Sequence, residues 1–183
     1  MSWYVATNGN STWGTNWSTA FTNVQHAINW ASEGDTIYMA GHEFNLWTDQ
    51  LVRTNNASGI RMSGGYEAAN DVQQPGTPDH EQWRTVLHQN NSAFRVLLIQ
   101  NVTNATLERI YLTGGQVSGH GGGLHLAGAK NFTMTSCIVS NNRTTGGTRY
   151  GGGIYADGTC VVTVNQCRIT HNYASNDSDV GGG

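Results

Sequence analysis

Charged side chains are scarce in this chain, because Asp, Glu, Lys and Arg together make up 11% of its 183 residues. The nine Lys and Arg residues form no basic stripe, which argues against a nucleic-acid partner. No apolar run approaches the roughly 20 residues that span a bilayer, so membrane insertion of this segment is not expected. The three cysteines, Cys137, Cys160 and Cys167, include no C-x-x-C pair, so neither a zinc site nor a full disulfide framework is indicated.

Glycine, Asn, Thr and Ser take the place of the missing charges, and the chain has 24 glycines but only two prolines. This composition disfavours surface helices and favours turns and strands. Disorder is not indicated, because apolar residues reach 37% and recur at regular spacings. The opening residues, Met1-Ser2-Trp3-Tyr4, contain no basic segment followed by an apolar stretch, so no signal peptide is visible.

A repeat dominates the last third of the chain. Gly121-Gly122-Gly123 recurs as Gly151-Gly152-Gly153 and again as Gly181-Gly182-Gly183, with the same spacing both times. The match extends to the positions that follow the glycines: Leu124 with Ile154, Phe132 with Val162, Met134 with Val164, Cys137 with Cys167, Val139 with Ile169, and Asn142 with Asn172. A fixed period of this length indicates a stacked-repeat architecture.

The apolar spacing within a repeat identifies the kind of solenoid. Phe132, Met134, Cys137 and Val139 are separated by steps of two, three and two, and Ala105, Leu107, Ile110 and Leu112 form an earlier copy that precedes them by slightly less than one full period. A step of two predicts a strand with one buried face, and the step of three predicts a corner at Glu108-Arg109, Thr135-Ser136 and Asn165-Gln166. A third strand follows the glycines, with Leu124 and Leu126 inward and His125 outward. We therefore predict an all-β, right-handed, single-stranded parallel β-helix with three short strands per rung.

Further strands are expected before the clear repeats: Thr36-Ile37-Tyr38-Met39, Leu51-Val52-Arg53, Ile60-Arg61-Met62, Thr85-Val86-Leu87 and Val96-Leu97-Leu98-Ile99. A polar stretch between Ala69 and Trp83 holds Pro75 and Pro78 and is expected to bulge as a loop from one corner. Residues 35–183 would then hold about five rungs. Because the chain stops at the opening of another rung, we expect the stack to continue beyond it.

The N-terminal end, residues 1–34, is predicted to hold a strand and a capping helix. Phe21, Val24, Ile28 and Ala31 follow one another at steps of three, four and three, which is one face of a helix. We predict that helix over residues 18–32, with Ser18 or Thr19 as the N-cap and Gly34 at its end. It would cover the first rung, whose core and strand edges are otherwise open. The alternative is a helix packed on the side of the stack.

Two features resemble known β-helix proteins. The stretch Trp17-Ser18-Thr19-Ala20-Phe21, Val24-Gln25-His26-Ala27-Ile28 and Gly34-Asp35-Thr36-Ile37 resembles the N-terminal entry of right-handed β-helix proteins of the pectate-lyase-like superfamily. Gly122-Gly123-Leu124 and Gly152-Gly153-Ile154, each followed by an Asn-ended strand, resemble repeats of polymorphic outer-membrane-type and autotransporter-like surface proteins. The resemblance implies a secreted or cell-surface protein. It implies little about activity, since the superfamily includes lyases, glycosidases, esterases, phage tailspikes and adhesins.

Acidic residues are too few to predict an active site in this segment. After Glu81 the chain has only Glu108, Asp157, Asp177 and Asp179, and no stacked carboxylate pair of the kind a glycoside hydrolase needs emerges from the repeat. Catalytic residues therefore stay unknown. The favoured function is a non-catalytic scaffold, adhesin or polysaccharide-binding surface. The alternative is a polysaccharide lyase or glycoside hydrolase whose catalytic rungs lie beyond residue 183.

A ligand surface is predicted where outward aromatic residues come together. His125 and Tyr155 stand one repeat apart, and Tyr150, Tyr173 and His120 are near them in sequence. Aromatic faces suit the C–H surfaces of sugars, and polar edges suit their hydroxyls, so these residues could line a shallow sugar-binding groove. The simpler interpretation is an exposed ladder that stabilises strand pairing.

Other sites and partners carry weaker signals. No cofactor is expected, although Asp177 and Asp179 in Asn176-Asp177-Ser178-Asp179 present alternating oxygen atoms that could hold calcium; a solvated loop is the simpler interpretation. Cys137 and Cys167 are expected to stack as reduced core thiols. Expected partners are a polysaccharide or cell-surface glycan, and another chain through end-to-end pairing of the uncapped C-terminal rung.

Overall fold

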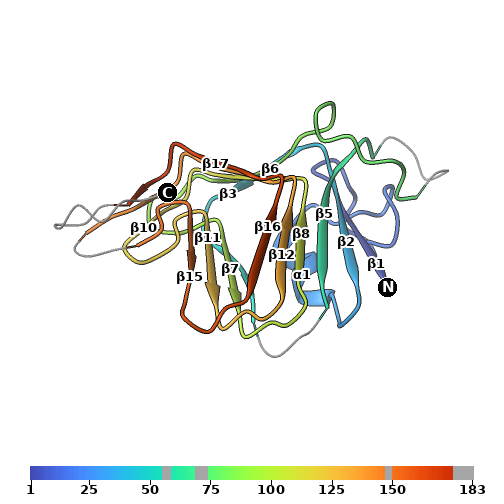
Figure 1. Ribbon diagram of the computed structural model, residues 1–183. Helices are drawn as coiled ribbons and strands as arrows, with labels where there is room; N and C mark the ends of the chain where they lie inside the picture. Colours follow the sequence, from blue (N-terminus) through green and yellow to red (C-terminus); the bar gives the residue numbers. More distant parts are fainter. Residues whose placement is uncertain (55–58, 69–73, 147–149, 175–183) are drawn as a thin grey trace.

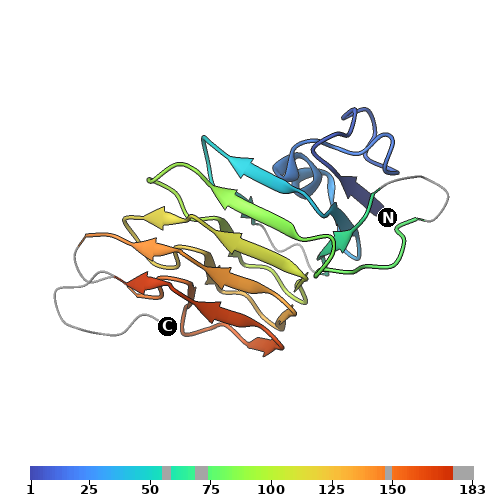
Figure 2. The same cartoon turned by 90° about the horizontal axis from the view of Figure 1, so that it is seen from above.

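The computed structural model describes residues 1–54, 59–68, 74–146 and 150–174. It confirms the predicted all-β fold, a parallel β-helix with one short N-terminal α-helix (Figure 1). Each described strand pairs in parallel with a counterpart in an adjacent rung, so the chain winds around a common axis. Figure 2 shows the rungs succeeding one another from the N-terminal to the C-terminal end of the stack.

The described residues form four parallel sheets that line the stack. Sheet A contains β1 (Ser2–Val5), β2 (Thr36–Ala40), β5 (Arg61–Tyr66), β8 (Thr106–Glu108), β12 (Phe132–Thr135) and β16 (Val162–Asn165). Sheet B contains β3 (Glu43–Leu46), β6 (Thr85–Gln89), β9 (Ile110–Thr113), β13 (Ile138–Ser140) and β17 (Arg168–Thr170). Sheet C contains β4 (Leu51–Arg53), β7 (Leu97–Gln100), β11 (Leu124–Ala127) and β15 (Ile154–Ala156). Sheet D contains β10 (Gln116–Val117), β14 (Arg143–Thr144) and β18 (Tyr173–Ala174).

Sheet D is an addition to the three strands per rung that the spacing predicts. Its strands are two residues long and lie between sheets B and C along the chain. A two-residue strand is too short to show the alternation of apolar and polar residues by which strands are recognised in a sequence. The five strands of sheet B match the predicted number of rungs.

The strand registers agree with the repeat. Leu124 pairs with Ile154, Phe132 with Val162 and Val139 with Ile169, each one full repeat period further along the chain. The slightly shorter step to the preceding copy is also confirmed, because Met134 pairs with Leu107. Alternate residues point into one continuous apolar core, in which Leu124, Leu126 and Met134 are fully buried. Removal of this apolar surface from water is the main force that holds short strands in a stack.

Left-handed backbone conformations mark the corners of the rungs. Arg109, Ser136 and Gln166 have φ angles of 54°, 52° and 52° at the predicted corner between sheets A and B. Gly121 and Gly151 have φ angles of 66° and 61°, which glycine adopts without steric cost. The triple glycines at 121–123 and 151–153 therefore each begin with a corner of the rung.

The predicted N-terminal helix is present but shorter than expected. Helix α1 spans Val24–Trp30, and its N-cap is Asn23, whose side chain accepts a hydrogen bond from the His26 amide. The predicted caps, Ser18, Thr19 and Gly34, are wrong: the preceding segment instead reaches β1 through a bridge from Phe21 to Val5, and the C-cap is Ala31. Backbone pairing to an exposed strand edge has displaced the first turns of the predicted helix.

Helix α1 lies over the N-terminal end of the stack, where it was expected. Its side chains Val24, Ala27 and Ile28 are buried in the common core. The Gln25 side chain pairs with both the amide and the carbonyl of Val52 on β4, at 2.7 and 2.9 Å. The helix thus covers the core and also provides hydrogen-bond partners for backbone groups at the open edge of β4. None of the helical structure in the described residues has the length and apolarity needed to cross a membrane.

Candidate functional site

The structure brings four of the five predicted aromatic ligand residues into contact on the outside of the stack. The His120 ring stacks on Tyr150 and Tyr155, with centroids 5.4 and 4.6 Å away. The His125 ring lies 5.2 Å from Tyr155, its strand partner across β11 and β15. The Tyr150 amide also donates to Nδ1 of His120 over 3.0 Å. We refer to His120, His125, Tyr150 and Tyr155 as the aromatic cluster.

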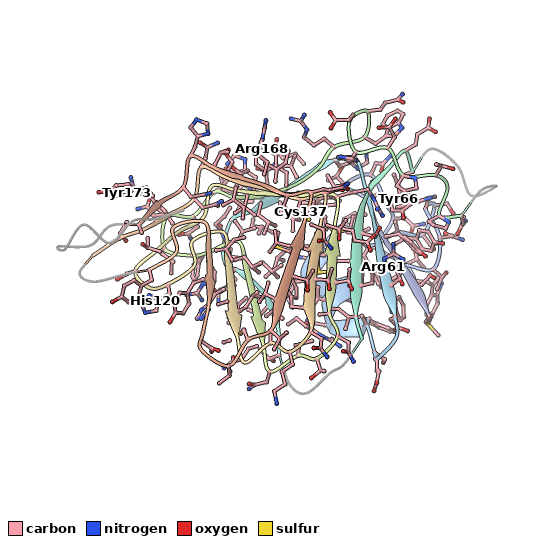
Figure 3. The ribbon with its side chains drawn as sticks, in the orientation of Figure 1. Arg61, Tyr66, His120, Cys137, Arg168 and Tyr173 are labelled. Carbon is pink, nitrogen blue, oxygen red and sulfur yellow. The ribbon has the colours of Figure 1, made fainter. Side chains whose placement is uncertain are left out.

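Tyr173, the fifth predicted aromatic residue, does not join this cluster. Tyr173 lies on β18 in sheet D, 64% exposed, and among the described residues it makes none of the ring contacts that join the cluster. Figure 3 places Tyr173 at the outer edge of the stack and His120 apart from it. The weak calcium candidates Asp177 and Asp179 lie outside the described residues. Within the described residues, no three His, Cys, Asp or Glu side chains gather where they could hold a metal ion.

Burial and a nearby cation lower the pKa of His125 in the aromatic cluster. Desolvation, followed by the charge of Arg95, lowers the pKa of His125 from 6.5 to about 4, so its imidazole is neutral at physiological pH. Arg95 donates to the Gln50 side chain at 2.9 Å and to the His120 carbonyl at 3.2 Å. Burial in turn lowers the pKa of Arg95. The His125 imidazole is therefore a neutral member of the cluster beside a fixed guanidinium.

The rings of the aromatic cluster face one another more than they face solvent. Tyr150, which stacks on His120, is 42% exposed, whereas His120, His125 and Tyr155 are partly buried. Ring faces that are already stacked cannot also stack on a sugar. The geometry supports a stabilising ladder between rungs, with the edge of Tyr150 as the part most open to a ligand.

A second site, which sequence reasoning missed, is a groove beside sheet B. Two adjoining hollows of about 250 and 20 Å³ share His80, Glu81, Arg84, Ser136 and Ile138 in their walls. We call them together the sheet B groove. Further lining residues are Thr85, Arg109, Ile110, Tyr111, Cys137, Gln166 and Arg168. The groove follows the start of β9, β13 and β17, and His80, Glu81 and Arg84 form another of its walls.

Guanidinium groups dominate the charge of the sheet B groove. Its lining includes Arg84, Arg109 and Arg168 but one carboxylate, Glu81, which lies 3.6 Å from His80. Arg84 and Arg168 are exposed at the groove, and Figure 3 shows Arg168 standing at the outer surface of the stack. The groove thus carries a net positive charge on a protein whose net charge is −3.

Arg109 is the fixed cation of the groove. Its guanidinium lies 3.0 Å from the Glu108 carboxylate and donates to the Gly64 carbonyl over 3.1 Å. Glu108 also pairs with Arg61, at 2.5 Å, and this contact raises the pKa of Arg61. Two arginines therefore share one carboxylate, and an excess positive charge remains beside the groove.

The period of the repeat aligns two of the three arginines of this groove but not the third. Arg84 comes from the loop before β6, Arg109 from a corner and Arg168 from the start of β17. Arg84 and Arg109 take equivalent positions in successive rungs, because Thr85 pairs with Ile110, whereas Arg168 lies two positions further along its rung, in line with Tyr111 and Ile138. Only the winding of the chain and the path of the loop bring the three side chains together.

The three cysteines are free thiols that pack toward the core. The Cys137 amide donates to the Cys167 sulfur over 3.4 Å, which confirms that the two residues stack on successive rungs. Cys160 packs against the Leu126 carbonyl, to which its thiol donates over 3.2 Å. The hydrogen bond with Cys167, followed by burial, raises the pKa of Cys137, so its thiol stays protonated.

Comparison with protein-family models, with curated proteins and with solved structures finds no match for this chain. The β-solenoid architecture is therefore established from the strand pairing alone.

Proposed function

We propose that this chain is a non-catalytic β-helix module of a secreted or cell-surface protein, and that it binds an acidic polysaccharide in the sheet B groove. The observation that carries the proposal is the gathering of Arg84, Arg109 and Arg168 from three segments into one groove. Guanidinium groups bind carboxylates through paired, charge-assisted hydrogen bonds, so they suit the uronate units of acidic glycans.

The floor of the groove adds surfaces that suit a sugar ring. Tyr111 and Ile138 are neighbours on β9 and β13, between the arginines. An aromatic face packs well against sugar C–H groups, and the hydroxyl and amide groups of Ser136 and Gln166 can bond sugar hydroxyls. The row of parallel strands gives an extended surface, as a polymer ligand requires.

We propose binding rather than cleavage because the described lining of the groove does not hold a pair of carboxyl groups. Hydrolysis of a glycosidic bond needs two carboxyl groups in defined positions. Among the described residues that line the groove, Glu81 is the carboxylate, and it lies at an exposed position beside His80. The aromatic cluster is assigned a structural part in this proposal, since its rings stack on one another.

Isothermal titration calorimetry with polygalacturonate oligosaccharides tests the proposal. We expect binding to the unmodified chain, weakening with added salt as the charge contacts are screened. The double variant Arg84→Ala, Arg168→Ala should lose at least about tenfold in affinity, because it removes two charge-assisted contacts. Both side chains are exposed, so folding should be unaffected.

Arg143→Ala is the matched control, because Arg143 is an exposed arginine on β14, away from the groove. It should leave the affinity unchanged. A neutral glucan of equal length should bind at least about tenfold more weakly than the uronate. Equal binding of both glycans, or equal loss of affinity in the Arg143 variant, would contradict the assignment of the groove.

A further inference from the structure

The first strand of sheet B has an outer edge with which no described segment of the chain pairs. Strand β3 is the last strand of sheet B at the N-terminal end, and β6 is its neighbour on the inner side. The Val86 amide donates to the His42 carbonyl, and the Asn90 amide donates to the Leu46 carbonyl. In a parallel ladder the residues alternate in direction, so Phe44 bonds toward β6 and the amides and carbonyls of Glu43 and Asn45 point away from it.

The neighbouring strand edges at this end are closed by the chain itself. The outer edge of β1 receives the backbone of Phe21, whose amide donates to the Tyr4 carbonyl over 2.9 Å. The outer edge of β4 receives the Gln25 side chain, which pairs with both polar groups of Val52. In the described part of the chain no group takes the same place along Glu43 and Asn45.

A groove runs along this open edge. It has a volume of about 400 Å³ and is lined by Thr7, Thr22, Asn23, Val24 and the whole of β3. Val24, Phe44 and Leu46 form its apolar side, and Leu46 is only partly buried. The volume lies in the usual range for ligand sites. An added strand of three to four residues, roughly 10–13 Å long, matches the length of β3.

We propose that the outer edge of β3 binds an extended peptide segment of a partner protein, which adds to sheet B as a further parallel strand. Strand addition uses main-chain hydrogen bonds for affinity and alternate side chains for specificity. The peptide residue beside Phe44 would be apolar, because it faces Val24 and the core. The peptide residue beside Glu43 would be Lys or Arg, because opposite charges on neighbouring strands attract. The Glu43 carboxylate lies 2.9 Å from His88 Nδ1, and its side chain is 52% exposed, so it can also contact a cation from outside.

The probe is the peptide acetyl-Thr-Lys-Leu-Thr-Val-Thr-amide, which places Lys beside Glu43 and Leu beside Phe44. Amide hydrogen exchange, followed by NMR, reports the binding edge directly. At saturating peptide, exchange at Glu43 and Asn45 should slow by about tenfold or more. Exchange at Phe44 and Leu46 should change little, because these amides already bond to β6.

Two matched controls separate strand addition from general adhesion. A peptide N-methylated at its Leu and Val has lost the donors that would reach the Glu43 and Asn45 carbonyls, and it should give no protection. Thr22→Trp fills the groove from an exposed position and should abolish the effect. Thr163→Trp adds the same side chain at an exposed position on β16, and it should leave the protection by the peptide unchanged. Thermal melting followed by circular dichroism checks that both variants fold.

Other outcomes would overturn the proposal. Protection at β16 instead of β3, or equal protection by the N-methylated peptide, would show that the edge does not select a strand. Slower exchange at Glu43 and Asn45 with rising protein concentration and no peptide would identify a second copy of the chain as the occupant. The result is independent of glycan binding, because the sheet B groove and the β3 edge share no lining residue.

Discussion

The side chains of Asn142 and Asn172 are hydrogen-bonded to each other at the same corner of successive rungs, with Nδ2 of Asn142 donating to Oδ1 of Asn172 over 3.1 Å. Asn142 is almost fully buried. Its amide group also donates to the carbonyls of Leu112 and Ser140, and its oxygen accepts from the Gly115 amide. One side chain thus satisfies backbone groups of its own rung and of the rung before it.

Asn142→Ala should destabilise the fold by about 3 kcal/mol, because it leaves several buried backbone groups without a partner. The free energy of unfolding from urea titration measures this loss. Asn165→Ala is the control, since Asn165 is exposed on β16, and its effect should stay within about 0.5 kcal/mol. Similar losses in both variants would show that the Asn142 bonds do not support the corner.

Gly122→Ala should cost at least about 2 kcal/mol, because a new methyl group would clash with backbone. A Cβ at Gly122 would lie 2.5 Å from the Gly152 carbonyl oxygen and 2.6 Å from the Arg143 carbonyl oxygen. Gly158→Ala is the matched control, as no atom lies within 4 Å of the added Cβ. Thermal denaturation should separate the two, and an unchanged midpoint for Gly122→Ala would contradict the close stacking of rungs at the glycines.

Ser136→Gly should stabilise the chain by roughly 0.5 kcal/mol. Glycine removes the steric strain of the left-handed backbone at φ 52°, and this gain exceeds the loss that comes from the greater conformational entropy of glycine in the unfolded chain. Thr135→Gly, one residue earlier in β12, should instead destabilise by about 1 kcal/mol, since a strand residue gains nothing from glycine. Chemical denaturation of the two variants tests whether the left-handed backbone at the corner is strained. The expectation fails if both substitutions shift the unfolding midpoint in the same direction.

Stability should fall as the pH is lowered from 6.5 toward 4, in part through His125. The pKa of His125 is lowered from 6.5 to about 4, mainly by burial, so in this window the unfolded chain binds a proton that the folded chain does not. The free energy of unfolding therefore rises with pH across the window. An NMR titration of the His125 ring should give a midpoint near 4.

His125→Phe provides the control for that pH dependence. Phenylalanine keeps a ring beside Tyr155 but cannot take up a proton, so the loss of stability between neutral and acid pH should be smaller than in the unmodified chain. Urea midpoints at neutral pH and at a mildly acid pH within that window make the comparison. An equal loss in both proteins would assign the acid sensitivity to other groups.

Much of the fold could be predicted because the repeat is local and periodic. Leu124, Phe132 and Val139 lie one repeat period before their observed partners, and that period determines both register and burial. The corner at Ser136 also follows from the spacing, since a step of three between buried positions requires a turn. Because these features recur in successive rungs, a strand or corner that is ambiguous in one repeat can be assigned from its counterpart in the next.

The helix boundary and sheet D could not be predicted in the same way. The face from Phe21 to Ala31 has helical spacing, yet Phe21 pairs with β1, because an unpaired strand edge near it forms backbone bonds. The pair Arg143-Thr144 of β14 is too short for any pattern. In both cases a contact with a distant segment decided the local structure.

Some features of the candidate sites also follow from the repeat, and others depend on contacts between distant segments. The outward pairing of His125 and Tyr155 follows from the amino-acid sequence, because the period of the repeat sets both positions. The stacking of the rings within the aromatic cluster depends on the three-dimensional path of the chain. The same path brings Arg168 to the groove that Arg84 and Arg109 line. The physical reason is that strand periodicity fixes which face a side chain occupies, whereas the path of loops and corners decides which residues from different rungs meet there.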